Sequence, residues 1–322
     1  MKYHRLRKEL VVGILLLLVG ASIIPVIAQE IEKPLPASRD QWVYVGGSGS
    51  GNYTKIQDAI DNASKGDTVF VYNGVYRQGN ILINKTVHLR GEEKNTTIID
   101  GCGQTYVFCF HGIGKLFIEL NGFTIQNASD GGIFCYSYNN TISGNIIQNN
   151  NMGILLTGAS NNLIYDNIIR KNSYGIFIFG NPHNSPVWNN IIEGNIIEDN
   201  SYGLNINGNA RNTYIQNNTI INNANYGIFV DFCYNTVIEK NNFIGNHPNV
   251  DFVFGGYLDD LKGIQIVMKR NYWENSRILP KIVFGKLEID LFTDFNGELV
   301  YFKLPWIGID WQPAYKPYQR RW

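Results

Sequence analysis

Cysteine, methionine and histidine are scarce in this chain of 322 residues, which contains 4 cysteines, 3 methionines and 5 histidines. Four cysteines are too few for a disulfide framework at this length, although Cys102 and Cys109 are close enough in sequence to close one short loop in an oxidising compartment. Thiol, thioether and imidazole groups are typical ligands of transition metals, and here they are scattered along the sequence. We therefore expect no metal site and no bound cofactor.

An excess of charge of either sign is also lacking, because 27 Lys and Arg balance 27 Asp and Glu. The first 28 residues contain four basic residues and one acidic residue, which leaves 23 positive and 26 negative charges in the remainder. Nothing in this balance favours nucleic acid as a partner. A hydrophobic content of 44% with 17% charged residues is typical of a folded protein.

Only one long apolar run is present, from Leu10 to Ala28, and the four basic residues precede it. This pattern predicts a targeting segment over residues 1–28, which is either cleaved after Ala28 or retained as a membrane anchor. Residues 29–42 then form a linker, and the rest of the chain is extracytoplasmic, secreted or held at the cell surface. Seven N-x-S/T sequons permit glycosylation of an exported chain, at Asn52, Asn62, Asn84, Asn95, Asn127, Asn139 and Asn217.

A short motif recurs along the middle of the chain, in which one asparagine precedes a pair of large residues and a second asparagine follows them. The first asparagine recurs at steps of 22, 28, 23 and 24 residues, at Asn145, Asn167, Asn195, Asn218 and Asn242. A glycine before Ile or Leu recurs at steps of 21, 22, 28 and 24 residues, at Gly132, Gly153, Gly175, Gly203 and Gly227. Two markers that share a period and lengthen in the same interval indicate a structural repeat.

Each repeat contains short strands, because Ile, Leu or Val alternates with other residues after the glycine and turn residues interrupt any helical period. Three strands and three turns in about 22 residues predict one coil of an all-β, single-stranded, right-handed parallel β-helix. Asparagine tolerates the left-handed backbone of a sharp turn, so we expect the repeated asparagines to occupy turns and to bond to one another between coils. The second ladder is expected at Asn150, Asn172, Asn200 and Asn223.

Both ends of the β-helix, which we place at residues 43–275, require caps because a solenoid otherwise exposes sheet edges. Apolar residues at helical spacing predict a short capping helix from about Tyr53 to Asn62. Residues 276–322 are predicted to form a C-terminal cap of two or three strands in the same domain. Large aromatic side chains are usually buried, so we expect three tryptophans to close the core at this end: Trp273, Trp306 and Trp311.

The segment "IQDAIDNASKGDTVFVYNGVY" followed by "HLRGEEKNTTIIDG" resembles the opening coils of pectin-lyase-like β-helix proteins. Together with the asparagine repeats, "RNYW" and "PWIGIDWQPAYKPY", it is similar to the NosD-like group of exported repeat proteins. That group is named for an accessory protein of copper-site assembly, and the wider group has the repeat of carbohydrate-binding proteins and sugar hydrolases. The resemblance implies the fold but not the activity, because this scaffold supports lyases, hydrolases, epimerases, esterases and non-catalytic binding proteins.

One stretch is similar to the catalytic coil of alginate epimerases and related lyases, whose motif there is Asp-Pro-His-Asp. This chain has Asn-Pro-His-Asn at 181–184, so His183 matches the family's histidine while both acids have become amides. An amide cannot accept a proton as a carboxylate does, which disfavours catalysis. If the protein is an enzyme, we expect His183 and Asp231 to be the catalytic residues. The alternative interpretation of 181–184 is a surface loop that explains the 28-residue step.

A possible ligand-binding surface lies on the outer side of the strand that follows the repeated glycine. If Ile178, Ile206 and Val230 face the core, their neighbours face outward by alternation. The predicted strip comprises Phe134, Tyr136, Phe177, Phe179, Asn205, Asn207, Phe229 and Asp231. Aromatic rings can contact sugar C–H groups while amides and carboxylates bind hydroxyls, although a loop or the C-terminal cap could instead cover the strip.

The sequence therefore predicts an exported or surface-anchored protein that binds polysaccharide, cell-surface glycan or another extended ligand without catalysis. A membrane is a partner only if the N-terminal segment is retained. Two alternatives stay open: a polysaccharide lyase, epimerase or hydrolase with a site near His183, and an accessory protein of extracytoplasmic copper-site maturation or a structural surface protein.

Overall fold

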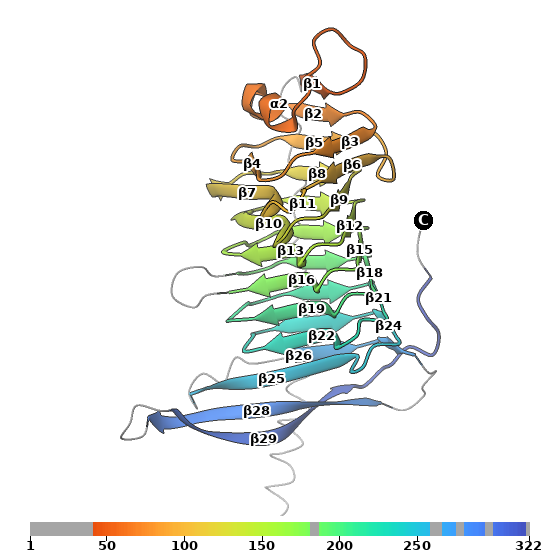
Figure 1. Cartoon of the computed structure of the whole chain (residues 1–322). Helices are drawn as coiled ribbons and strands as arrows, with labels where there is room; N and C mark the ends of the chain where they lie inside the picture. Colours follow the sequence, from red (N-terminus) through yellow and green to blue (C-terminus); the bar gives the residue numbers. More distant parts are fainter. Residues whose placement is uncertain (1–40, 181–186, 258–265, 275–279, 294–298, 320–322) are drawn as a thin grey trace, which may run out of the picture. The chain divides into compact units, whose positions relative to one another are not determined.

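A computed structural model describes residues 41–180, 187–257, 266–274, 280–293 and 299–319. These residues form a parallel β-solenoid of stacked coils with one short helix near its N-terminal end, which confirms the predicted fold (Figure 1). No helix among the described residues combines the length and apolar character required to cross a bilayer. The predicted targeting segment and His183 lie outside the described residues.

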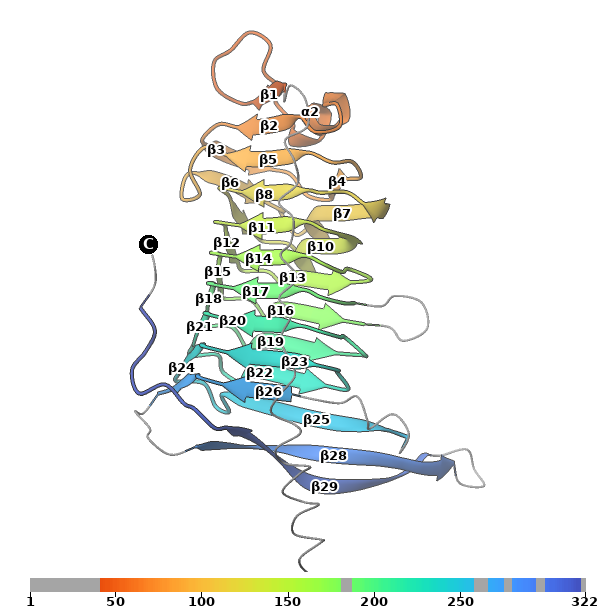
Figure 2. The ribbon, with the colours of Figure 1, turned by 180° about the vertical axis from the view of Figure 1, so that it is seen from behind.

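Sheet 1 faces the viewer in Figure 2 and pairs its strands in parallel from one coil to the next. Its strands are β1 (Trp42–Val45), β2 (Thr68–Val71), β5 (His88–Gly91), β8 (Glu119–Asn121), β11 (Thr141–Ser143), β14 (Leu163–Tyr165), β17 (Ile191–Glu193), β20 (Tyr214–Gln216), β23 (Thr236–Glu239) and β26 (Ile266–Lys269). Helix α2 (Ile56–Asn62) lies between β1 and β2 in the chain and buries Ile56, Ala59 and Ile60 against the first coil, so the capping helix is confirmed with a later start than predicted.

Sheet 2 follows sheet 1 within each coil and is also parallel. Its strands are β3 (Gly74–Arg77), β6 (Thr97–Asp100), β9 (Thr124–Gln126), β12 (Ile146–Gln148), β15 (Ile168–Arg170), β18 (Ile196–Glu198), β21 (Thr219–Ile221), β24 (Asn242–Ile244) and β27 (Tyr272–Trp273). The middle residue of most of these strands is a fully buried aliphatic residue, such as Ile147, Ile169 and Ile197. These residues stack in register and form part of the core.

Sheet 3 completes each coil and continues into the C-terminal strands. Its strands are β4 (Ile81–Ile83), β7 (Tyr106–Lys115), β10 (Gly131–Tyr138), β13 (Met152–Thr157), β16 (Tyr174–Phe179), β19 (Tyr202–Asn207), β22 (Tyr226–Asp231), β25 (Val250–Tyr257), β28 (Lys281–Thr293) and β29 (Leu299–Asp310). Strand β28 pairs in parallel with β25, and β29 folds back antiparallel on β28. The predicted C-terminal strands are therefore present.

The repeated asparagines form buried ladders between the coils, as predicted. Asn167 is representative, because its Nδ2 donates to Asn195 Oδ1 at 3.0 Å and its Oδ1 accepts from the backbone N–H and the Nδ2 of Asn145 at 3.0 and 3.1 Å. Column one comprises Asn145, Asn167, Asn195, Asn218, Asn241 and Asn271, and column two comprises Asn150, Asn172, Asn200, Asn223 and Asn246. All of these amides are buried, so the ladder supplies the hydrogen bonds that water cannot.

Two details of the predicted ladders are wrong. Asn241, not Asn242, continues column one, because Asn218 Nδ2 donates to Asn241 Oδ1 at 3.0 Å, while the Asn242 side chain bonds the backbone of Tyr318. The left-handed backbone also lies one residue earlier than expected. It is the residue before each ladder asparagine that has a positive φ, for example 54° at Asp166 and 57° at Asn217. The turn and the ladder therefore use consecutive residues.

A third ladder was not predicted from the sequence. Asn140 Nδ2 donates to Asn162 Oδ1 at 2.9 Å, and Asn162 Nδ2 donates to Asn190 Oδ1 at 3.1 Å. Thr213 and Thr236 take the next two places in register, and their buried hydroxyls have no hydrogen-bond partner. Each coil thus has an asparagine column at each of its three corners in the middle of the solenoid, and the third column ends earlier than the other two.

The repeated glycine is explained by a close approach between coils. A Cβ on Gly175 would lie 2.5 Å from the Gly203 carbonyl oxygen and 3.1 Å from Asn200 Nδ2. Gly153 is in the same position relative to Gly175 and Asn172. Any larger residue would push the coil away from the second ladder, so glycine and asparagine share a period because they pack against each other.

A carboxylate ends column one at the C-terminal side. Asp310 is fully buried and accepts hydrogen bonds from five N–H groups: those of the Arg270, Asn271 and Gln312 backbone, Asn271 Nδ2 and Trp273 Nε1. Trp273 is 3% exposed and stacks on Phe243, as expected for a residue that closes the core. Trp306 and Trp311 are 46% and 68% exposed, so the prediction that they seal the core is wrong. The backbone of β28 and β29 covers Phe252 and Met268 instead.

All four cysteines are free, so the possible Cys102–Cys109 bridge is not formed in this structure. Cys135 and Cys233 are fully buried, and the Cys233 thiol lies 3.3 Å from the Ile206 carbonyl oxygen. Burial raises the pKa of Cys135 to about 11 and raises the pKa of Cys233 further. These two side chains are inert parts of the core.

Candidate functional site

The outer face of sheet 3 lies where strand alternation places it. Ile178, Ile206 and Val230 are fully buried and stack in register. Their neighbours Phe177 and Asn205 are half-buried, and Phe179 is 40% exposed. The predicted strip is therefore a surface, with part of each side chain in solvent.

Register brings the predicted strip residues together as vertical neighbours. Phe177 pairs with Asn205 and Asn205 with Phe229, so these three side chains form one row across β16, β19 and β22. Phe179 pairs with Asn207 in the adjacent row. Phe134 is separated from Phe177 by Leu155, which is only 9% exposed and interrupts the polar and aromatic surface. Tyr136 pairs with His111 on β7, so it lies toward the N-terminal end of the strip.

A column of tyrosines adjoins the strip and was missed from the sequence. Tyr174 stacks on Tyr202 with ring centroids 4.7 Å apart, and Tyr202 stacks on Tyr226 at 5.6 Å. The column meets the strip at both ends, because Tyr174 contacts Phe177 at 5.3 Å and Tyr226 contacts Phe229 at 5.2 Å. The available signal was the tyrosine that directly precedes the repeated glycine in three successive coils. The ring faces of this column cover one another, so it supports the neighbouring phenylalanines.

Carboxylates lie at both ends of this aromatic surface. Burial and then a hydrogen bond from the Tyr106 hydroxyl to Asp130 raise the pKa of Tyr106 to about 12. Burial and then the charge of Asp251 raise the pKa of Tyr226. Both hydroxyls therefore stay protonated at neutral pH and remain hydrogen-bond donors. Asp251 itself pairs in register with Phe229, one coil beyond the strip.

The candidate catalytic pair is only partly described. Asp231 is half-buried at the end of β22, within the predicted strip. His183 follows Phe179 by four residues but lies outside the described residues. A shared site of these two residues therefore stays a prediction, and the strip is the surface that the described residues define.

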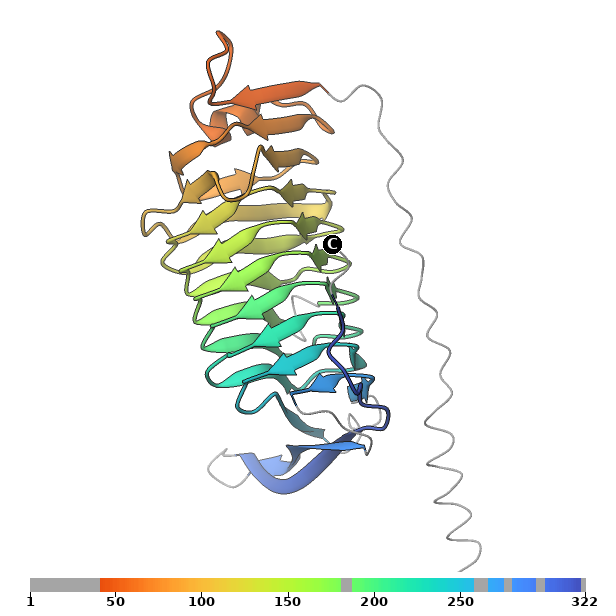
Figure 3. The ribbon, with the colours of Figure 1, turned by 90° about the vertical axis from the view of Figure 1, so that its right-hand side faces the viewer.

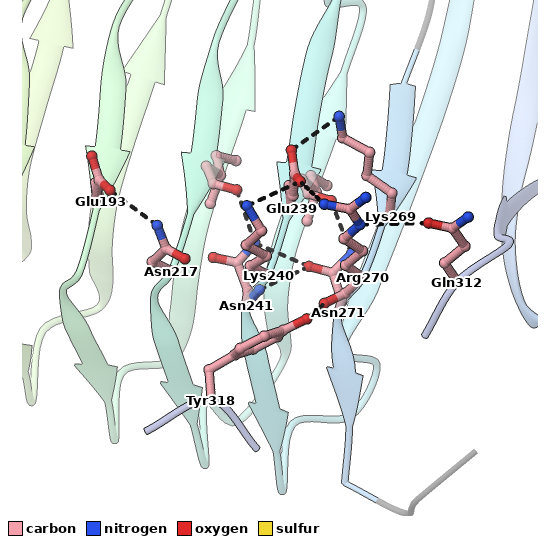
Figure 4. Close-up of polar contacts among 12 residues, drawn as sticks. Glu193, Asn217, Glu239, Lys240, Asn241, Lys269, Arg270, Asn271, Gln312 and Tyr318 are labelled. Carbon is pink, nitrogen blue, oxygen red and sulfur yellow. Dashed lines mark hydrogen bonds and ion pairs between the residues drawn. The ribbon is translucent and has the colours of Figure 1, made fainter. Parts of the chain in front are cut away.

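A cluster of charged residues around Glu239 occupies the C-terminal end of sheet 1 (Figure 4). The Glu239 carboxylate, 14% exposed, lies 3.0 Å from Lys269 Nζ, 3.4 Å from Lys240 Nζ and 3.8 Å from Arg270 Nη1. The Tyr318 hydroxyl donates to the Arg270 carbonyl oxygen at 2.6 Å, and the Ala314 N–H donates to the Asn271 carbonyl oxygen at 2.8 Å. The segment after β29 turns back along the coils (Figure 3). The hydrogen bonds of Ala314 and Tyr318 hold it against the backbone of Arg270 and Asn271.

We expect Glu239 to make stability depend on pH. Burial raises the pKa of its carboxyl, but Lys269 and Lys240 together outweigh burial and leave the pKa below its ordinary value. The stabilisation is therefore complete above the pKa of an unfolded glutamate, about 4.3, and is lost as pH falls through the folded value. The free energy of unfolding in urea should be measured at pH 6 and at pH 3. Its fall between these two pH values should be about 1 kcal/mol smaller for Glu239→Gln than for the wild type. Glu193→Gln is the control, because Glu193 bonds the neutral amide of Asn217, and an equal pH response of all three proteins would contradict the prediction.

Residues 60–277 match the family model described as "Periplasmic copper-binding protein (NosD)", which is more than half of the chain. The chain belongs to the NosD family. The family description places NosD proteins in the periplasm, so the predicted extracytoplasmic location is confirmed at that level. Among curated proteins, none is a significant match to the sequence.

Solved structures similar to this NosD-family chain include polysaccharide-degrading enzymes. Pectate lyase Pel9A has a TM-score of 0.52 with 15% identity, over 73% of this chain and 72% of that chain. The alginate lyase from Paenibacillus sp. str. FPU-7 has a TM-score of 0.52 with 18% identity, over 67% and 87%. The Agl-KA catalytic domain has a TM-score of 0.58 with 17% identity, over 76% and 50%. At these identities the likeness shows the fold and not the activity.

Copper, which the NosD family description implies, does not fit the described residues. A copper site needs several imidazole, thiolate or thioether ligands together, and the described part of the chain brings no three His, Cys, Asp or Glu side chains into one group. The three described histidines lie apart in the fold: His88 is 3.0 Å from Glu119 on the outside of sheet 1, His111 stacks on Tyr136 on sheet 3, and His247 is exposed after β24. The sulfurs of Cys135 and Cys233 are enclosed in the core. No step is therefore assigned to copper.

Proposed function

We propose that this NosD-family protein is exported and binds polysaccharide along the outer face of sheet 3, without catalysis. The observation that carries the proposal is the row of Phe177, Asn205 and Phe229 in register on three successive coils, with Phe179 and Asn207 beside it. Rings with partly exposed surfaces contact sugar C–H groups, and amides between them exchange hydrogen bonds with hydroxyls. Coils about 4.8 Å apart repeat this surface at a distance close to the length of one pyranose residue.

Two features support binding without catalysis. The sequence at 181–184 has amides where related lyases and epimerases have acids, and Asp231 is the one carboxylate in the predicted strip. Acid and base catalysis of sugar cleavage usually needs two ionisable groups in reach of one bond. The rival enzyme function requires His183 and Asp231 to act together, and release of reducing ends or unsaturated products from any polysaccharide would establish it.

The resemblance to NosD-like proteins favours a second function, in which the protein assists assembly of an extracytoplasmic copper site, and the family description names copper binding. The misfit of the described ligands weighs against direct copper binding, and metal analysis of the purified protein would decide this. The N-terminal segment is proposed either to be cleaved after Ala28 or to anchor the protein to the membrane, and the mass of the exported chain distinguishes these forms.

Replacing Phe177 by alanine is expected to weaken polysaccharide binding about fivefold, because one partly exposed ring contributes about 1 kcal/mol of contact with sugar. Affinity electrophoresis through gels that contain a panel of polysaccharides measures this loss. Tyr214→Ala is the matched control, since Tyr214 is a half-buried aromatic residue on the outer face of sheet 1. Binding that is equally affected by both changes, or absent for every polysaccharide, would remove the proposed function.

A further inference from the structure

Lys and Arg are missing from the central strands of sheet 3, from β10 to β25. The six sheet 3 strands β10, β13, β16, β19, β22 and β25 contain no Lys or Arg in their sequences, and neither do the two residues on either side of each of these strands. The chain as a whole has 27 Lys and Arg, and sheets 1 and 2 display several of them, including Arg90, Arg170 and Lys269. The aromatic surface of sheet 3 is therefore a place where positive charge is absent while the other two sheets have it.

The charged side chains on these six strands, Asp231 and Asp251, are negative, and the next strand, β28, has a lysine, Lys286, paired with Val253. Asp130 borders the N-terminal end of the tyrosine and phenylalanine surface through Tyr106, and Asp231 and Asp251 lie at its C-terminal end. Two basic residues lie on β7 at its N-terminal edge: His111, which stacks on Tyr136, and Lys115, which pairs in register with Tyr138. The connection 181–186 contains no Lys or Arg in its sequence, and 258–265 contains two Asp and one Lys. A uronate chain bound here would meet carboxylates of its own sign.

From this charge pattern, and on the basis of the proposed function, we infer that the strip binds a neutral polysaccharide of hexopyranose units and rejects polyuronates. Neutral sugars offer apolar C–H faces to Phe177 and Phe229, and their hydroxyls can donate to Asp231 or Asp251 and bond the amides of Asn205 and Asn207. A pectate or alginate chain would need Lys or Arg partners, or a calcium ion held by clustered acids. The described residues bring no three acidic, His or Cys side chains into one group that could hold such an ion.

This specificity differs from what the structural neighbours alone would suggest. Pectate lyase Pel9A and the alginate lyase share the fold, and their names refer to acidic polysaccharides. The difference follows from charge alone and does not depend on whether the protein has any catalytic activity. It concerns the same surface as the proposed function and narrows its ligand to one chemical class.

Affinity electrophoresis of the purified chain tests the inference with two neutral polysaccharides, barley β-glucan and galactomannan, and two polyuronates, polygalacturonate and alginate. Each is run with calcium and with EDTA. We expect at least one neutral polysaccharide to retard the chain, and both polyuronates to bind at least tenfold more weakly in every condition. Stronger retardation by a polyuronate, with or without calcium, overturns the inference and leaves glycan binding intact. No retardation by any of the four overturns this inference, and the proposed function then depends on the wider panel.

A variant with an added positive charge tests whether sheet 3 is the surface that discriminates against polyuronates. Asn205→Lys places a cation between Phe177 and Phe229, and we expect it to raise polyuronate affinity at least tenfold. Gln216→Lys is the control, because Gln216 lies on sheet 1 between Glu193 and Glu239 and should leave polyuronate affinity unchanged. Far-ultraviolet circular dichroism confirms that both variants fold. A gain in Gln216→Lys, or none in Asn205→Lys, would overturn the assignment of this surface.

Discussion

Asn195→Ala is expected to destabilise the solenoid by about 3–5 kcal/mol, because it breaks a buried polar network. Asn195 is fully buried in the middle of column one. Its Nδ2 donates to Ile164 O at 2.9 Å and to Asn218 Oδ1 at 3.0 Å, and its Oδ1 accepts from the N–H and Nδ2 of Asn167. Alanine removes the donors and the acceptor together, so groups on the two adjacent coils lose partners in a site that water cannot enter.

Equilibrium unfolding in urea measures the expected loss. Asn225→Ala is the control, because Asn225 is exposed on a neighbouring coil and its backbone N–H bond to Ser201 O survives the change. The control should stay within about 0.5 kcal/mol of the wild type. A loss below about 1 kcal/mol for Asn195→Ala would mean that the ladder contributes little, and that burial of aliphatic residues alone holds the coils in register.

The ladders were predictable in kind because their asparagines recur with the period of the coil. The choice between Asn241 and Asn242 was not settled by spacing, since both fit a step of 23 or 24 residues. The position of the buried core residue distinguishes Asn241 from Asn242. The residue two places after each column one asparagine is buried, as Ile197 is after Asn195, and Phe243 occupies that place only relative to Asn241. The third ladder had its own signal in the Asn-Asn pairs that end at Asn140, Asn162 and Asn190.

Residues beyond the repeat were harder to place, because nothing in the sequence repeats there. Hydrophobicity alone predicted burial of Trp306 and Trp311, and the structure exposes both. Asp310, one residue before Trp311, is fully buried. An acid followed by tryptophan gives no sequence signal for a ladder end, because its partners come from the distant residues 270–273. Long-range contacts of this kind are visible only in the folded chain.

In the candidate site too, local sequence patterns predicted part of the arrangement, and contacts between coils determined the rest. Alternation along one strand was enough to place Phe177, Asn205 and Phe229 on the outer face, and the period of the repeat was enough to stack them. The sequence did not reveal that Leu155 separates Phe134 from this row, because the extent of its burial depends on neighbours in the adjacent coils. The continuous part of the strip is therefore confined to β16, β19 and β22.

Asp310→Asn is expected to loosen the C-terminal cap by about 2–4 kcal/mol, although asparagine is the residue that every other place in column one contains. A ladder asparagine needs both a donor and an acceptor, because it lies between two coils. Asp310 has only donors around it, with two N–H groups on Oδ1 and three on Oδ2 at 2.9–3.2 Å. An amide nitrogen in either position would face N–H groups, and at least two of them would lose their acceptor.

The loss should be local to the end of the solenoid, because coils of a repeat protein contact mainly their neighbours. Hydrogen exchange should therefore speed up for β27, β28 and β29 in Asp310→Asn, while β11 to β19 keep the protection of the wild type. Asp199→Asn is the matched control, since Asp199 is exposed with a φ of 54° that asparagine also tolerates. Unchanged exchange in the cap of Asp310→Asn would show that the carboxylate is replaceable, and that the backbone pairing of β28 with β25 is sufficient to close the core.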